Sequence, residues 1–203
     1  MKAARWIGIG LVMIGFALVA AVYARLPDPV PMHVSWRGEP GNFVAKPWGA
    51  LLPPMLSAVI YAITLAVTRR MPRLAVLPVA IAAFGLFAHV LLIRAALGEP
   101  ASSRAVFAGV GALFIVIGNY LGVLRRNRWI GIRTPWTLAD AEVWLRTHRV
   151  GGWAFVAAGV VTELAVVAGA PPQVMTAPLV LAALGPAVYS AILYRQLRAG
   201  GPT

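Results

Sequence analysis

Residues 74–97 read LAVLPVAIAAFGLFAHVLLIRAAL, a run in which Arg94 is the only fixed charge. About 20 consecutive, mostly apolar residues are enough to cross the hydrocarbon core of a bilayer as an α-helix. This run is therefore predicted to be a membrane-spanning helix. Five more segments have the same character, and the six predicted spans are residues 6–24, 48–67, 74–97, 105–124, 150–169 and 174–194.

The composition of the whole chain supports the same class of protein. Of its 203 residues, 60% are hydrophobic and only 12% are charged, whereas an ordinary soluble domain is about 25% charged. Proline and glycine gather between the runs, at residues 26–31, 98–100 and 169–172, where turns are expected. We predict a single all-α, polytopic membrane domain. Residues 1–24 also match a signal peptide, but the run is long enough to span and more spans follow.

The positions of lysine and arginine predict the orientation, because these residues are enriched in cytoplasmic loops. With both termini inside, the inner face carries thirteen of the 18 basic residues and the outer face five. The inner set is Lys2, Arg5, Arg69, Arg70, Arg73, Arg125, Arg126, Arg128, Arg133, Arg146, Arg149, Arg195 and Arg198, and the outer set is Arg25, Arg37, Lys46, Arg94 and Arg104. We therefore predict that both ends lie in the cytoplasm.

The net charge of +12 does not require a nucleic-acid partner. Arginines beside a membrane interact favourably with anionic lipid headgroups, so lipid is the predicted partner and direct binding to nucleic acid is not expected. The chain has no cysteine, which excludes disulfides, thiolate metal sites and cysteine nucleophiles. No cofactor is predicted, and the sequence leaves the oligomeric state open.

Two loops are longer than a hairpin between helices requires, and long loops often carry function. The outer loop, residues 25–46, contains prolines that favour an extended chain and glycines that permit tight turns. His33 with Asp28 and Glu39 gives only a weak metal-site pattern. A hydrogen-bonded loop histidine is the favoured interpretation, and no metal site is predicted.

The inner loop, residues 125–149, is predicted to contain a short amphipathic helix in its second half. Thr137 is the expected N-cap, with acidic residues in the first turn and basic residues in the last. Glu142 and Arg146 are expected to pair at a spacing of four. One face, formed by Ala141, Trp144, Leu145 and His148, is expected to meet membrane or protein.

These loops, in this order, resemble the SdpI family of bacterial membrane proteins, which is named for immunity to a secreted toxin. The most specific part is GIRTPWTL at residues 131–138, followed by Val143-Trp144 and by THRVGG at residues 147–152. The outer loop resembles the domain of unknown function that accompanies this family, through Pro31, His33, Gly38 and Lys46. Gly41 departs from that pattern, which usually has an aspartate at this position.

The resemblance implies a two-module chain in the bacterial cytoplasmic membrane, with residues 1–70 as the N-terminal module and residues 71–203 as the SdpI-like module. It implies protection against a secreted peptide toxin and recruitment of a small cytosolic winged-helix repressor. The expected docking surface on the inner loop consists of Arg133, Thr134, Pro135, Trp136, Trp144, His148 and Arg149.

Three polar residues within predicted spans are further candidates, because ionisable groups in the membrane are costly. A pair formed by His89 and Glu163 would suit a small proton-coupled transporter or exporter, which is the alternative function. Asn119 lies in the Gly118-x-x-x-Gly122 pattern, where a hydrogen bond between closely packed helices is expected.

An enzyme is not predicted, because no serine has a histidine and an acid at a recognisable spacing and no phosphate-binding glycine loop is present. A lipid-acting membrane enzyme and a structural membrane protein without a ligand stay open as alternatives.

Overall fold

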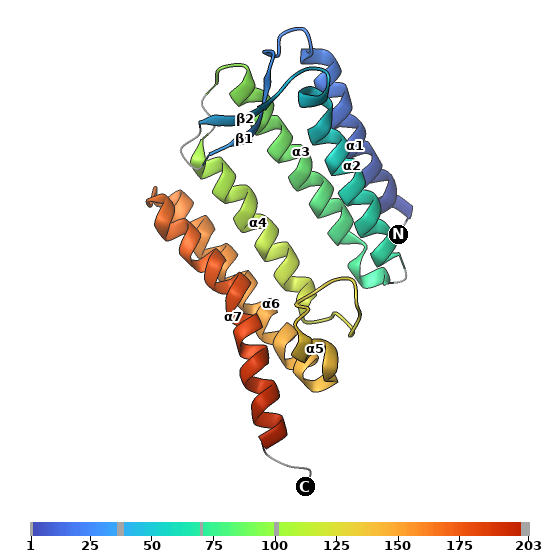
Figure 1. Cartoon of the computed structure of the whole chain (residues 1–203), viewed down its shortest axis with the longest axis vertical. Coiled ribbons are helices and arrows are strands. Elements are labelled where there is room, and N and C mark those ends of the chain that lie inside the picture. Colours follow the sequence, from blue (N-terminus) through green and yellow to red (C-terminus); the bar gives the residue numbers. More distant parts are fainter. Residues whose placement is uncertain (1, 36–38, 70, 100–101, 200–203) are drawn as a thin grey trace. The chain divides into compact units, whose positions relative to one another are not determined.

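The computed structural model describes residues 2–35, 39–69, 71–99 and 102–199. Within these ranges, six helices are long and apolar enough to cross a membrane, as predicted. They are α1 (Lys2–Val22), α2 (Trp48–Thr68), α3 (Val76–Ala96), α4 (Ser103–Leu121), α6 (Ala141–Val167) and α7 (Pro172–Ala199). The short η1 (Pro72–Leu74) precedes α3, and α5 (Pro135–Ala139) precedes α6 (Figure 1).

The chain forms two compact units, Met1–Val110 and Gly111–Thr203. In the first unit α1, α2 and α3 pack together, and a hairpin of β1 (Val30–Val34) and β2 (Pro40–Val44) lies beside the ends of α2 and α3 (Figure 1). The strands are antiparallel, with Val30 opposite Val44 and His33 opposite Gly41. Val19, Leu26, Val30 and Ala50 form a buried cluster that fixes the base of the hairpin to the helices. The sequence predicted an extended chain here but not two paired strands.

The second unit contains the C-terminal part of α4 with α5, α6 and α7. Helices α4 and α6 approach each other closely, and both helices contribute glycines to the contact. A Cβ on Gly118 would lie 2.8 Å from the Gly152 carbonyl oxygen, and one on Gly159 would lie 2.6 Å from the Gly111 carbonyl oxygen. Small residues let helix backbones approach closely in membranes. The close approach predicted at Gly118 is thus present, and α6 also packs along α7.

The inner amphipathic helix differs from its prediction. Helix α6 begins at Ala141 and continues without interruption to Val167, so the expected interfacial helix and the fifth span are one helix. Its N-cap is Asp140, not Thr137. The expected apolar face is also divided, because Trp144 and His148 are buried while Leu145 is exposed. The predicted pair is present, with Arg146 Nε 2.6 Å from Glu142 Oε1.

Candidate functional site

The inner loop is built around two consecutive helix starts. Thr134 caps α5 by accepting the N–H of Thr137, and Thr137 Oγ1 accepts the N–H of Thr134 in return, which forms a reciprocal capping box. Pro135 occupies the first helical position, where a missing N–H costs nothing. One turn later, Asp140 Oδ1 accepts the N–H groups of Glu142 and Val143 at 2.8 and 3.0 Å. These caps fix the direction in which the chain enters α6.

His148 attaches the loop backbone to α6. Its Nε2 accepts the N–H of Ile132 at 2.9 Å, and its Nδ1 lies 2.8 Å from the Trp144 carbonyl oxygen. Because Nε2 is the acceptor, the ring is neutral and Nδ1 carries the hydrogen. The ring also stacks on the indole of Trp144, with 3.9 Å between centroids. The histidine therefore joins the loop to the helix over 16 residues of sequence.

Trp144 holds the other end of the loop. Its Nε1–H donates to the Leu124 carbonyl oxygen at 2.8 Å, and the side chain is 2% exposed. Buried indoles usually find such a partner. The loop is therefore tied to α6 just after α4 ends and again at Ile132.

Gly131 is required at the contact between the loop and His148. It has φ +106°, a region that side chains rarely adopt, and a Cβ at this position would overlap His148 Nε2. The glycine in the GIRTPWTL motif therefore allows the Ile132 N–H to reach the imidazole.

Two hydroxyl groups connect the loop to α7. Thr134 Oγ1 lies 2.9 Å from Ser190 Oγ, and the Ser190 hydroxyl donates to the Ala187 carbonyl oxygen at 2.6 Å. Thr137 Oγ1 donates to the Ile132 carbonyl oxygen at 2.8 Å. Ser190 of α7 thus helps to hold the loop. The sequence carried no signal for this contact.

The predicted docking residues divide between the interior and the surface. Trp144 and His148 are buried, and Thr134 and Trp136 are partly buried. Arg133, Pro135 and Arg149 are exposed. The Arg133 guanidinium donates to the Arg128 carbonyl oxygen at 2.8 Å, which holds the side chain against the loop. Only the exposed and partly buried residues are available to a partner. Trp144 and His148 are buried, so they hold the loop backbone in place and are not part of its surface.

The outer hairpin is held at its ends by two polar residues. The N–H of Lys46 donates to Asp28 Oδ1 at 3.1 Å, and Lys46 Nζ donates to the Tyr23 carbonyl oxygen at 2.9 Å. Pro31 is buried and His33 is exposed, whereas Gly38 lies outside the described residues. No group of three metal-binding side chains occurs in the ranges that the structure describes. Lys46 thus closes the hairpin on the end of α1, and the His33 side chain is exposed.

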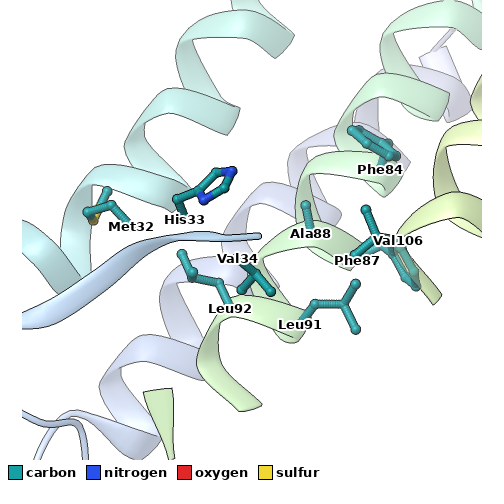
Figure 2. A pocket seen from close by; sticks show the side chains of 9 residues that line it. All are labelled: Met32, His33, Val34, Phe84, Phe87, Ala88, Leu91, Leu92 and Val106. Atoms are coloured by element: carbon teal, nitrogen blue, oxygen red, sulfur yellow. The ribbon is translucent and has the colours of Figure 1, made fainter. Parts of the chain in front are cut away.

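A pocket of about 200 Å³ lies between the hairpin and α3. Its lining is almost wholly apolar, with His33 as the polar member. Figure 2 shows the residues that line it: Met32, His33, Val34, Phe84, Phe87, Ala88, Leu91, Leu92 and Val106. Pockets for whole ligands usually measure about 300–1,000 Å³, so this one fits a single large apolar side chain.

The intramembrane polar residues have different surroundings. Asn119 donates to Ile115 within its own helix, so the expected bond between helices is not what the structure shows. Within the described part of the chain, His89 Nδ1 and Glu163 Oε1 are buried without a hydrogen-bond partner. His89 faces Gly15 of α1, and Glu163 faces Gly111 of α4. They belong to different units, so their pairing stays a prediction.

Six helices that are long and apolar enough to span a membrane define a polytopic membrane protein, and the chain also contains a structured inner loop and an outer hairpin. Residues 123–190 match the model of the SdpI/YfhL protein family, and residues 10–58 match a domain of unknown function, DUF1648. The chain is 30% identical over 162 residues to "Immunity protein SdpI" of Bacillus subtilis (strain 168), covering 75% of this chain and 76% of that protein. The chain belongs to the SdpI/YfhL protein family. No solved structure matches it significantly.

Proposed function

We propose that this chain is an immunity protein of the bacterial cytoplasmic membrane, which protects its cell from a secreted antimicrobial peptide. The observation that carries the proposal is the extent of the match to Immunity protein SdpI, which covers three quarters of both chains. Each of the two family matches includes one of the two structured loops, and both loops are held by tertiary hydrogen bonds.

On the outer side, the peptide is proposed to meet the hairpin and the pocket beside it. An apolar side chain of the peptide would enter the pocket, and the exposed imidazole of His33 would offer a hydrogen bond at its edge. A pocket of about 200 Å³ suits such a side chain better than a transported small molecule.

On the inner side, a small winged-helix repressor is proposed to dock on Arg133, Pro135 and Trp136. These residues are exposed or partly exposed on a loop whose backbone is fixed by His148, Trp144 and the capping threonines. A rigid surface loses little conformational entropy when a partner binds.

The test is survival of a peptide-sensitive bacterium that expresses the full chain and is treated with the peptide. Wild type is expected to raise survival, and so are His89→Gln and Glu163→Gln, because protection does not use a proton relay. Loss of protection in these two variants, at equal membrane levels, would favour the transporter instead. No protection by a correctly inserted wild-type chain would contradict the proposal.

Docking is tested separately by affinity capture from cytosol, with the bound proteins identified by mass spectrometry. Arg133→Gln is expected to lose a winged-helix regulator that wild type captures, while survival is unchanged. Arg195→Gln is the matched control, because it removes one exposed arginine from the far end of α7. Equal capture of that regulator by wild type and Arg133→Gln would exclude this docking surface.

A further inference from the structure

The arginines of the inner loop greatly outnumber the carboxylates available to them. Residues 125–149 contain six arginines and two acidic residues. Asp140 is occupied by two backbone N–H groups of α6, and Glu142 is paired with Arg146. The other five arginines have no ion-pair partner among the residues that the structure describes. This face therefore carries a concentrated, unneutralised positive charge.

Three of these arginines are close to the end of α4. Arg125 and Arg126 follow Leu124 directly, and both are exposed. On α6, the Cα of exposed Arg149 lies 4.0 Å from the place that a Cβ on Gly122 would take. The cytoplasmic end of α4 and one face of α6 therefore bring Arg125, Arg126 and Arg149 into one neighbourhood.

A large aromatic side chain lies one helical turn deeper along the same face of α6. Trp153 is four residues after Arg149 and 75% exposed. Residues at this spacing are neighbours on a helix surface, and exposed indoles favour the boundary between headgroups and hydrocarbon. Arg149 and Trp153 therefore suit the two parts of a phospholipid. The guanidinium would lie at the depth of the phosphate, and the indole would lie at the boundary between headgroups and hydrocarbon. A free anion in the cytosol would bind the arginines without contacting the indole.

The backbone that carries these groups is already ordered. Asn127 Oδ1 accepts the N–H groups of Trp129 and Ile130 at 2.8 and 2.9 Å, and Asn127 Nδ2 donates to the Arg125 carbonyl oxygen. Trp144 holds the Leu124 carbonyl immediately before the arginines. Binding therefore requires ordering of side chains only, which favours a defined site over a diffuse attraction.

We propose that Arg125, Arg126, Arg149 and Trp153 form a binding site for the headgroup of an anionic phospholipid in the inner leaflet. This site is distinct from the proposed repressor surface at Arg133, Pro135 and Trp136, and it does not depend on the immunity function.

The test measures lipid dissociation constants of the purified full chain by native mass spectrometry in a neutral detergent. Phosphatidylglycerol and phosphatidylcholine with the same acyl chains are the two probes. Wild type is expected to bind phosphatidylglycerol at least tenfold more tightly. Each arginine near a membrane surface contributes about fivefold to such an affinity, so Arg126→Gln with Arg149→Gln should weaken phosphatidylglycerol binding about 25-fold.

Two matched variants keep the test specific. Arg195→Gln with Arg198→Gln removes the same charge from the end of α7 and should change the affinity less than about threefold, since a distant surface charge is screened. Arg126→Lys with Arg149→Lys keeps the charge and should retain most of the affinity. Equal losses in the two glutamine double variants would overturn the site and indicate diffuse electrostatic attraction.

Two more outcomes would also overturn it. Displacement of phosphatidylglycerol by millimolar inorganic phosphate would identify a site for a free anion. Unchanged lipid affinity in Arg126→Gln with Arg149→Gln, together with lost capture of a cytosolic protein, would identify a protein-docking surface.

Discussion

The inner loop and the outer hairpin have similar lengths, but they are held in different ways. The inner loop is fixed by buried side chains that reach its backbone from α6, namely His148 to Ile132 and Trp144 to Leu124. The outer hairpin is fixed by its own strand pairing, by the buried apolar cluster at its base, and by exposed or partly exposed hydrogen bonds at its ends, from Asp28 and Lys46. An exposed hydrogen bond exchanges with water and contributes little, whereas breaking a buried one leaves an unsatisfied group.

Because the two loops are held differently, the residues that identify the family have different roles in each loop. In the inner loop, four residues of the motif shape the backbone, namely Gly131, Thr137, Trp144 and His148. The exposed Arg133, Pro135 and Arg149 are residues of the motif that a partner can reach. In the outer hairpin, His33 is exposed and lines a pocket, so it is free to meet a ligand directly.

The largest expected effect is at Trp144. Trp144→Ala removes a side chain that is 2% exposed and leaves the Leu124 carbonyl without its donor. We expect the free energy of unfolding to fall by about 3–5 kcal/mol. Unfolding of the full chain in mixed micelles, followed by near-ultraviolet circular dichroism, measures this. Trp129→Ala is the control, because Trp129 is 73% exposed and its loss should cost less than about 0.5 kcal/mol. An equal loss of unfolding free energy in the two variants would show that the buried Trp144 does not stabilise the loop more than the exposed Trp129 does.

Gly131→Ala is expected to have the next largest effect. The left-handed φ of +106° alone costs a side chain about 1–3 kcal/mol, and the overlap with His148 Nε2 breaks the bond to Ile132. Thermal unfolding of the purified chain should show a lower midpoint than wild type. Gly185→Ala provides the matched control, since a Cβ there meets nothing within 4 Å and α7 is helical around it. An unchanged midpoint for Gly131→Ala would show that the loop has another stable arrangement.

Much of this fold could be predicted, because each membrane-spanning helix is marked by a continuous apolar run in the sequence. The apolar runs predicted all six helices, with α2 at Trp48–Thr68 against a predicted 48–67. The start of α6 was wrong by nine residues, because the segment after Ala141 is polar on its surface and resembles a separate interfacial helix. A signal for this start was present in Asp140, because aspartate is a favoured N-cap and Asp140 directly precedes the first residue of α6.

The site was less predictable, because its contacts join residues that are distant in sequence. Nothing near His148 indicates that its partner is a backbone N–H 16 residues earlier. The same applies to Ser190, which reaches Thr134 over 56 residues. The motif identified the correct segment of the chain, but it could not separate buried residues from exposed ones. Asn119 shows the converse error, because a polar residue near a glycine crossing was assigned to the crossing although it bonds within its own helix.

A change at His148 tests one hydrogen bond that holds the inner loop. His148→Leu leaves the Ile132 N–H without an acceptor in a partly buried position, which should cost about 1–3 kcal/mol. Hydrogen exchange of a peptide covering residues 129–134 should become faster, while exchange in the outer hairpin stays unchanged. His148→Gln, whose amide oxygen is an acceptor, should restore part of the protection. Equal exchange in wild type and His148→Leu would mean that the imidazole does not hold the loop.

The smallest expected effect is at Asp28, where the outer hairpin closes. Asp28→Ala removes the acceptor of the Lys46 N–H, and because this bond is exposed its loss should cost only about 0.5–1.5 kcal/mol. Asp28→Asn keeps an acceptor oxygen and should behave almost like wild type. Both variants are compared with wild type by unfolding and by exchange in a peptide covering residues 39–46. If Asp28→Ala destabilised the chain as much as Trp144→Ala, the hairpin would be as dependent on single side chains as the inner loop is. The contrast between the two loops would then lie in their exposure alone.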